Sequence, residues 1–146
     1  MVIGALQGPW RFVDDELVYE NPEGFSLLGA RCQDCTGVGV TTFPYQASCP
    51  RCGGERMAPV QLPRRGKLWS FTIQRFRPPA HRTSAEDFAP YAVGYVDLGS
   101  VIVEARIDEA DPARLTIGHP VSLCTLPIYE ADGMLVHTYA FRLETD

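Results

Sequence analysis

The sequence has no apolar stretch long enough to cross a membrane. Its longest uncharged apolar runs, such as VSLCTLPIY at residues 121–129, fall far short of the roughly 20 residues that a spanning helix requires. The opening residues MVIGALQGPWRF also lack the basic start and long apolar core of a secretory signal. We therefore expect a cytoplasmic protein in a reducing compartment, where paired cysteines hold a metal more often than they form a disulfide.

Common catalytic motifs are absent as well. There is no GxSxG segment and no glycine-rich phosphate-binding loop. The three histidines, His81, His119 and His137, lie in separate parts of the chain, with no sign of an acid–base partner for any of them. We interpret them as structural or surface residues, and we predict that this chain is not an enzyme by itself.

Basic residues are scarce outside one band. The chain has 13 basic and 18 acidic residues, which gives a net charge of −5. Eight of the basic residues but only one acidic residue, Glu55, lie between Arg51 and Arg82. Proteins that bind nucleic acid in general are usually basic over a whole domain, so this balance argues against that class. The arginines of the band either cover apolar neighbours or meet a small anion.

Four of the five cysteines form two pairs with the same internal spacing. They are Cys32, Cys35, Cys49 and Cys52, and thirteen residues separate the pairs. A two-residue gap lets both thiolates of a pair bind one metal from a tight turn, and this spacing predicts one zinc ion per chain rather than iron or a disulfide. A shell of four cysteines has no open position for substrate, so we expect the zinc to be structural and to contribute folding free energy.

Residues beside the cysteines fit this interpretation. Gly53 offers the left-handed backbone conformation that such a turn favours, and Pro50 stiffens the turn. Arg31 and Arg51 are placed to offset part of the negative charge of the site. The fifth cysteine, Cys124, lies far away in an apolar segment, where we expect a small buried hydrophobic residue rather than a reactive thiol.

The remaining sequence is mainly of strand type. Residues 8–20 predict a short helix, because Trp10, Val13 and Leu17 fall at helical spacing. A strand at residues 25–32 then leads into the first cysteine pair. Later segments alternate between apolar and polar residues, and strands are expected at the positions 67–76, 91–107 with a turn at 97–100, and 121–143 with a turn near 132–133.

Together these segments predict a mainly β protein. About five strands without repeats favour a small closed β-barrel of the OB type, although the strand number alone also allows a two-sheet sandwich. Residues 77–90 form a long loop rich in proline and polar residues, of a kind that is often functional.

The motifs and their order resemble those of the DUF35 family. Besides the two cysteine pairs and the FP at residues 43–44, the chain contains RRGKLWSFT, PYAVGYVDL and LTIGHPV in that order. The resemblance extends from about Phe25 to Arg142. It implies a rubredoxin-like zinc ribbon at residues 29–60 and a C-terminal OB-fold at residues 61–146, preceded by a helical segment and a lead-in strand at residues 1–28.

The resemblance also implies a role. Proteins of this family accompany thiolase-like enzymes that make or break carbon–carbon bonds in acyl-CoA substrates, including the aldolase of steroid side chains. The thiolase-like partner carries the catalytic residues, so this chain is expected to be a non-catalytic subunit of a hetero-oligomer, and steroid side-chain degradation is the preferred pathway. The residues that we expect to face the partner are Trp10, Phe12, Leu17, Phe43 and Tyr45, and the alternative is that they close the protein's own core.

Two other functions stay open. The first is a CoA or acyl-CoA binding module, in which Phe76 or Trp69 meets the adenine or the acyl chain. Its phosphate contacts would be Arg75, Arg77, His81 and Arg82. The second, which the acidic charge disfavours, is binding of single-stranded nucleic acid through barrel aromatics. The candidates for stacking on bases are Trp69, Phe71 and Tyr95.

Overall fold

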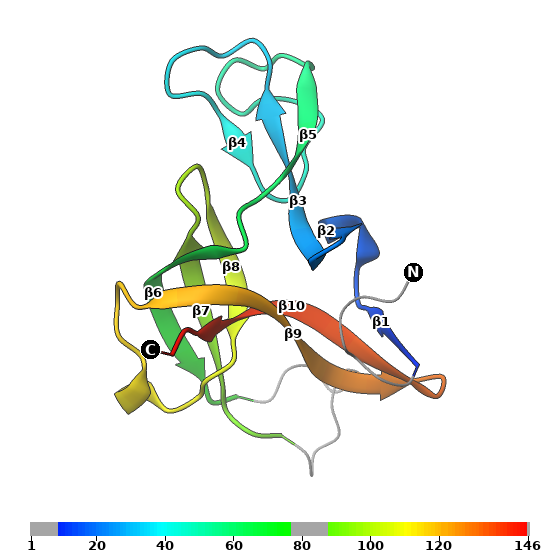
Figure 1. Ribbon diagram of the computed structural model, residues 1–146, viewed down its shortest axis with the longest axis vertical. Coiled ribbons are helices and arrows are strands. Elements are labelled where there is room, and N and C mark those ends of the chain that lie inside the picture. Colours follow the sequence, from blue (N-terminus) through cyan, green and yellow to red (C-terminus); the bar gives the residue numbers. More distant parts are fainter. Residues whose placement is uncertain (1–8, 77–87, 146) are drawn as a thin grey trace.

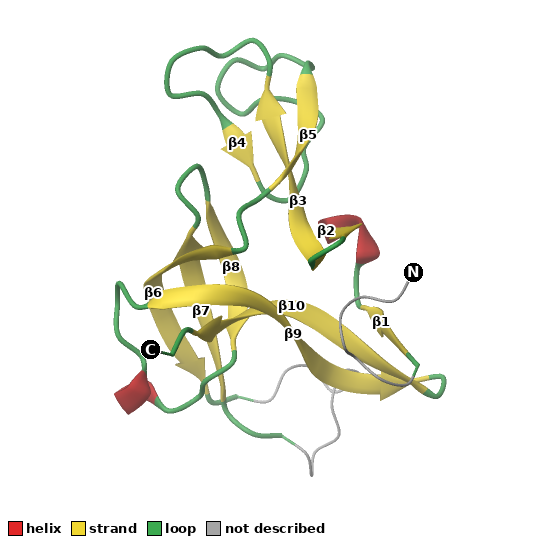
Figure 2. Cartoon of the chain, in the orientation of Figure 1, coloured by secondary structure: helices red, strands yellow, loops and turns green. Residues whose placement is uncertain are grey.

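The computed structural model describes residues 9–76 and 88–145, and within them nearly all regular structure is strand (Figures 1 and 2). The elements, in chain order, are β1 (Trp10–Phe12), the 3₁₀ turn η1 (Asp15–Leu17), β2 (Val18–Asn21), β3 (Gly24–Cys32), β4 (Thr41–Thr42), β5 (Met57–Gln61), β6 (Arg65–Gln74), β7 (Tyr91–Asp97), β8 (Ile102–Ile107), the 3₁₀ turn η3 (Pro112–Arg114), β9 (Pro120–Ala131) and β10 (Met134–Leu143). Neither of the short helical turns in the described part of the chain is long or apolar enough to span a membrane.

Five strands close into a barrel. Three antiparallel pairings join β8 to β7, β7 to β6 and β6 to β9. Strand β10 closes the ring by pairing with both β9 and β8. This closure confirms the OB-type barrel and rules out the two-sheet sandwich. The interior is filled by buried apolar side chains such as Leu68, Val96 and Phe141, each at most 1% exposed.

Both predicted turns between barrel strands are present. The β9–β10 hairpin turns at Asp132 and Gly133, whose φ angles of +53° and +75° are those of a two-residue hairpin loop. The β7–β8 turn is closed by a hydrogen bond from the amide of Leu98 to the carbonyl of Val101. Alternating apolar residues and turn residues were therefore sufficient to locate these hairpins.

The predicted helix at residues 8–20 is wrong. Only Asp15–Leu17 forms a single 3₁₀ turn, capped by the side chain of Asp14, which accepts a hydrogen bond from the amide of Glu16. The residues before it form β1, which pairs in parallel with β10 and buries Phe12 in the barrel core. The pairing with β10 and the burial of Phe12 override the local helical spacing, because tertiary contacts outweigh weak intrinsic propensity.

A β-bulge in β6 changes the predicted alternation of that strand. Leu68 pairs with Val96 and Ser70 pairs with Tyr95, which leaves Trp69 without a partner between them. Trp69 is therefore 54% exposed, whereas Phe71 packs against the barrel core. Sequence alternation placed these two side chains on one face, and the extra residue of the bulge separates them.

Strand β3 joins the barrel to the cysteine region. Phe25 and Leu27, near its start, belong to the barrel core, whereas Ala30 and Cys32 at its end belong to a second, smaller core. Along its second half β3 pairs with β4 on one edge and β5 on the other, forming the small sheet that projects from the barrel at the top of Figure 1.

Candidate metal centre

The two cysteine pairs are brought together by the pairing of β3 with β5. Cys32 is the last residue of β3 and lies opposite Met57, the first residue of β5. Cys35 follows in the turn after β3, and Cys49 and Cys52 lie in the loop that leads into β5. A hydrogen bond from the amide of Gln33 to the carbonyl of Arg56 links the first turn to the segment after the second, and one from the amide of Cys32 to the carbonyl of Val40 closes the first turn.

The four sulfur atoms form a compact cluster. All lie within 4.8 Å of one another, with 3.7 Å between the sulfurs of Cys32 and Cys52 and 3.8 Å between those of Cys35 and Cys49. A regular tetrahedron of thiolates bound to zinc at about 2.3 Å has edges of about 3.8 Å. The cluster therefore matches the size and shape of a four-thiolate metal site.

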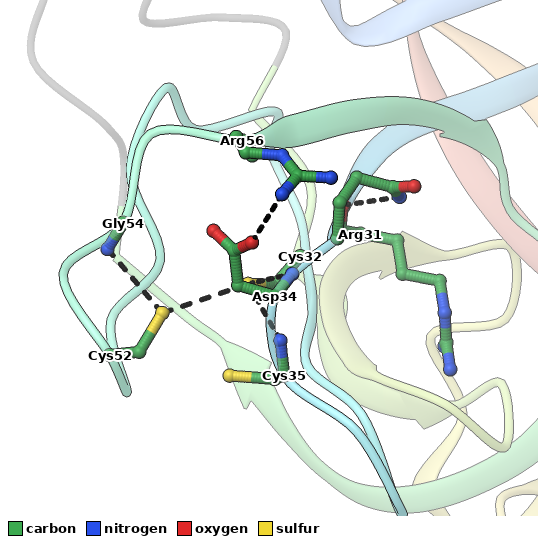
Figure 3. A network of polar contacts seen from close by, with 8 residues as sticks. Arg31, Cys32, Asp34, Cys35, Cys52, Gly54 and Arg56 are labelled. Atoms are coloured by element: carbon green, nitrogen blue, oxygen red, sulfur yellow. Dashed lines mark hydrogen bonds and ion pairs between the residues drawn. The ribbon is translucent and has the colours of Figure 1, made fainter.

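Backbone amides point at the sulfur atoms, as expected for thiolate ligands (Figure 3). Cys32 Sγ accepts from the amides of Asp34 and Cys35, both at 3.4 Å, and Cys52 Sγ accepts from Gly54 at 3.4 Å. Cys49 Sγ accepts from Arg51 at 3.3 Å. The second turn is completed by Gly53 with the predicted left-handed conformation, at a φ angle of +76°.

The thiols of Cys35, Cys49 and Cys52 do not ionise alike. The amide of Cys52 and that of Arg51 lower the pKa of Cys49 to about 6, because they stabilise its thiolate. Burial, together with hydrogen bonds from neighbouring thiols, raises the pKa of Cys35 to about 12. The amide of Gly54 favours the thiolate of Cys52, but hydrogen bonds with Cys32 and Cys49, together with burial, outweigh it and the pKa of Cys52 is raised. Four thiolates so close together therefore need a bound cation to neutralise their repulsion.

The charged residues around the cluster differ partly from the prediction. Arg51 contributes its backbone amide to Cys49, but the side chain of Arg31 turns away from the sulfurs toward Thr41 (Figure 3). Gly39 makes room for Arg31, since a Cβ at that position would lie 2.5 Å from the guanidinium. Asp34 was not among the predicted residues, and its carboxylate binds Arg56 at 2.9 Å beside the cluster. An acid inside a C-x-x-C turn was the available signal.

The arrangement has the properties of a structural centre. Cys32 and Cys49 are 3% and 2% exposed, and together with Ala30 and Met57 they make up the second core. Two cysteines thus supply half of the four buried residues that form this second core. The four sulfurs fit zinc, which would link the end of β3 to the loop before β5, and they leave no ligand position for a substrate.

The residues predicted to face a partner have different environments. Phe12 is only 8% exposed and packs against Phe25 in the barrel core, which fits the alternative that these residues close the protein's own core. Phe43 is half-buried, and its ring meets that of Tyr139 on β10 at 5.6 Å. Trp10 and Leu17 are half-buried, and Tyr45 is 43% exposed. Of the five, Tyr45 therefore offers the largest accessible ring.

The basic band is partly committed to contacts within the molecule. Arg65 binds Glu144 at 2.6 Å, and Arg64 donates to the carbonyl of Phe25 and stacks on its ring. Arg75 is exposed at the end of β6. The other three predicted phosphate contacts lie outside the described residues, and they are Arg77, His81 and Arg82.

The described histidines and Cys124 have structural contacts. His119 Nε2 lies 3.0 Å from the carbonyl of Glu144, and His137 Nδ1 lies 3.3 Å from Thr125 Oγ1 beneath the ring of Trp10. Cys124 is half-buried, and burial raises its pKa to about 11. The one hydroxyl–imidazole contact among them, between Thr125 and His137, is not accessible to a substrate, because His137 is only 4% exposed.

Comparison with known proteins identifies similar chains. Residues 59–126 match the model of the family described as ChsH2, C-terminal OB-fold domain. A DUF35 domain-containing scaffold protein of Pyrococcus furiosus is 30% identical over 124 residues, which cover 82% of this chain and 85% of that protein. Benzoylsuccinyl-CoA thiolase subunit BbsA of Thauera aromatica is 33% identical over 118 residues, covering 80% and 75% of the two chains.

A solved structure has the same fold. The chain titled Ltp2-ChsH2(DUF35) aldolase superposes with a TM-score of 0.59 at 24% identity. The match covers 81% of this chain and 84% of that chain. The match is therefore longer than the barrel of residues 61–146 alone.

Proposed function

This chain belongs to the DUF35 family, and from that membership we propose that it is a non-catalytic, zinc-binding subunit of a thiolase-like enzyme. The partner carries out the carbon–carbon bond chemistry on an acyl-CoA, of the retro-aldol or Claisen type. Steroid side chains remain the preferred substrate class, and an aromatic acyl-CoA, as in the name of the Thauera relative, is the second.

One observation carries the proposal. A relative named as a thiolase subunit aligns with most of both chains, and the alignment is long enough to include more than the barrel. In addition, the hydroxyl–imidazole contact between Thr125 and His137 is buried, whereas a thiolase reaction requires catalytic groups that reach the substrate. The catalytic residues are therefore supplied by the other subunit.

In this proposal the four cysteines have a positioning role. Cys32, Cys35, Cys49 and Cys52 hold one zinc, which supplies a cross-link between two turns and takes no part in a reaction step. Residues 29–60 then form a ribbon that β3 joins to the barrel of residues 61–146. Residues 1–28 are the N-terminal segment that precedes the ribbon. The rigid ribbon presents Tyr45, and the half-buried Trp10 and Leu17 border the accessible surface of the N-terminal segment.

A second role is compatible with this one. Arg75 and Phe76 are both exposed at the end of β6, and Phe76 is 82% exposed, which suits contact with the phosphates and base of CoA. Arg77, His81 and Arg82 complete this predicted contact set. Calorimetry of the purified chain with CoA tests this role. We expect the wild-type chain to give a binding signal below millimolar CoA and an Arg75→Ala variant to give a weaker one.

The experiment that tests the main proposal is affinity purification of the tagged chain from its native host at moderate salt. We expect a thiolase-like protein in near-equal amount together with about one zinc per chain. Tyr45→Ala should reduce the recovered partner, whereas Ile117→Ala, which truncates a 66% exposed residue on the loop before β9, serves as the matched control. Zinc without any thiolase-like partner would contradict the proposal.

A further inference from the structure

The four cysteines differ in their access to solvent. Cys32 and Cys49 are buried and Cys35 is half-buried, but Cys52 is exposed. Figure 3 shows Cys52 at the edge of the network, beside Gly54. A metal held by these sulfurs would therefore be reached from solvent at one ligand.

Gly54 keeps the approach to Cys52 open. A Cβ at Gly54 would lie 3.3 Å from Cys52 Sγ and 3.0 Å from Asp34 Oδ2, so the absence of a side chain there uncovers the sulfur. At the neighbouring Gly53, an added Cβ would meet no atom of the described residues within 4 Å beyond its chain neighbours. The exposure of Cys52 thus depends on Gly54.

We propose that Cys52 is a site of oxidation by peroxides and that Cys32 is its resolving cysteine. The inference rests on the proposed zinc centre, because zinc holds the cysteines as the thiolates that react. Cys32 Sγ lies 3.7 Å from Cys52 Sγ, although the two residues belong to different turns. The product is a disulfide between the turns, and the metal is released.

The reaction balances with a hydroperoxide as the oxidant. The thiolate of Cys52 attacks the terminal peroxide oxygen, so that a sulfur–oxygen bond forms and the oxygen–oxygen bond breaks. The peroxide is reduced to an alcohol or water after taking up a proton, and Cys52 becomes a sulfenic acid. The Cys32 thiolate then attacks the Cys52 sulfur, a sulfur–sulfur bond forms, and the hydroxyl group leaves as water after taking up a second proton.

Loss of two ligands leaves the metal with the sulfurs of Cys35 and Cys49, which is too few to retain it in competition with a chelator. These two sulfurs are 3.8 Å apart, and a second peroxide joins them in the same way. Oxidation therefore connects the two turns by bonds across the cluster, whereas a disulfide within one C-x-x-C turn would leave the turns separate.

The sequence allows a direct test by peptide mapping. The zinc-loaded chain is treated with limiting hydrogen peroxide, zinc release is followed with a chromophoric chelator, and free thiols are then alkylated. Trypsin cleaves after Arg31, Arg51 and Arg56, Asp-N before Asp34, and chymotrypsin after Tyr45. Each of the four cysteines is then on its own peptide, so mass spectrometry identifies every linkage without ambiguity.

We expect about one zinc released per peroxide and a product in which the peptide of residues 52–56 is linked to that of residues 32–33. A link between Cys52 and Cys49, or zinc release with Cys52 unmodified, would overturn the inference and leave the proposed zinc centre intact. A chain that contains no zinc before peroxide is added would instead refute the metal assignment, and this inference with it.

Two variants sharpen the result. Gly54→Ala places a methyl group against Cys52 Sγ, and we expect zinc release by peroxide to slow at least severalfold in a variant that still binds one zinc. Cys124→Ser is the matched control, because this cysteine lies outside the cluster and its loss should leave the release rate unchanged. An unchanged rate in Gly54→Ala, or a slower one in Cys124→Ser, would contradict oxidation at Cys52.

Discussion

The barrel and the cysteine ribbon differ in the size of their cores. Among the residues that the structure describes, fifteen buried ones form the barrel core, including Phe141, Leu27 and Val121 with no exposed surface. The core of the ribbon has four buried residues, and two of them are cysteines. Burial of an apolar side chain contributes about 1.5–3 kcal/mol, so the barrel has a source of stability that the ribbon lacks.

The barrel is closed by strand pairing around an apolar interior, whereas the ribbon contains a cluster of four sulfurs. If these sulfurs hold the proposed zinc, one chain combines two sources of folding free energy. Strand β3 belongs to both, since it places Phe25 in the barrel core and Cys32 in the metal centre. The barrel can therefore fix the base of the ribbon, but it cannot hold the two turns together.

The largest expected effect is that of removing a buried metal ligand. Cys49→Ser should abolish stable zinc binding and unfold the two turns, because the metal contributes on the order of 10–16 kcal/mol of apparent binding free energy to a site of this type. Zinc content and amide hydrogen exchange of residues 30–57 measure the loss. Cys124→Ser should keep one zinc, and a Cys49→Ser chain with full zinc content and protected turns would break the comparison.

The next effect belongs to the barrel. Phe141→Ala removes a fully buried ring and should lower the free energy of unfolding by about 3–5 kcal/mol in chemical denaturation. Ile117→Ala, which removes a side chain of a residue that is 66% exposed, should change it by less than about 0.5 kcal/mol. Zinc content should stay the same in both variants, and loss of zinc from Phe141→Ala would show that the two regions do not fold by separate means.

A smaller effect is expected from pH. Burial lowers the pKa of His137 below its usual value of 6.5, so the unfolded chain binds a proton more readily than the folded chain. The contribution of neutral His137 to the free energy of unfolding is fully present above pH 6.5 and is lost as the pH falls through the lowered pKa. Chemical denaturation, monitored by tryptophan fluorescence at several pH values, measures this dependence. A chelator is present throughout, so that acid-induced loss of metal does not contribute. The free energy of unfolding should depend on pH in the wild type and depend on it less in His137→Gln.

The smallest expected effect concerns the ion pair beside the cysteines. Asp34 and Arg56 are 39% and 73% exposed, and exposed pairs contribute about 1 kcal/mol or less. Asp34→Asn should therefore weaken zinc binding by no more than about fivefold in a chelator competition. A loss of a hundredfold or more would mean that the carboxylate, rather than the thiolates alone, determines metal affinity.

Spacing and alternation predicted the features that depend on neighbouring residues in the chain. The four cysteines came together as two C-x-x-C turns, and the hairpin at Asp132 and Gly133 formed where turn residues interrupt alternating strands. The remaining features depend on distant partners. Trp10 lies in β1, which pairs with β10 instead of forming a helix. The bulge at Trp69 results from the pairing of β6 with β7. No local pattern encodes those pairings.

In the proposed structure of the metal centre, bound metal keeps the ribbon folded, whereas the barrel is stabilised by its own core. Two-dimensional amide NMR of the zinc-loaded chain, recorded before and after addition of a strong zinc chelator, tests it most directly. We predict that amide signals of residues 30–57 move to unfolded positions while those of β7 and β8 stay in place. Unchanged ribbon signals after zinc removal, or loss of the barrel signals together with them, would contradict the account.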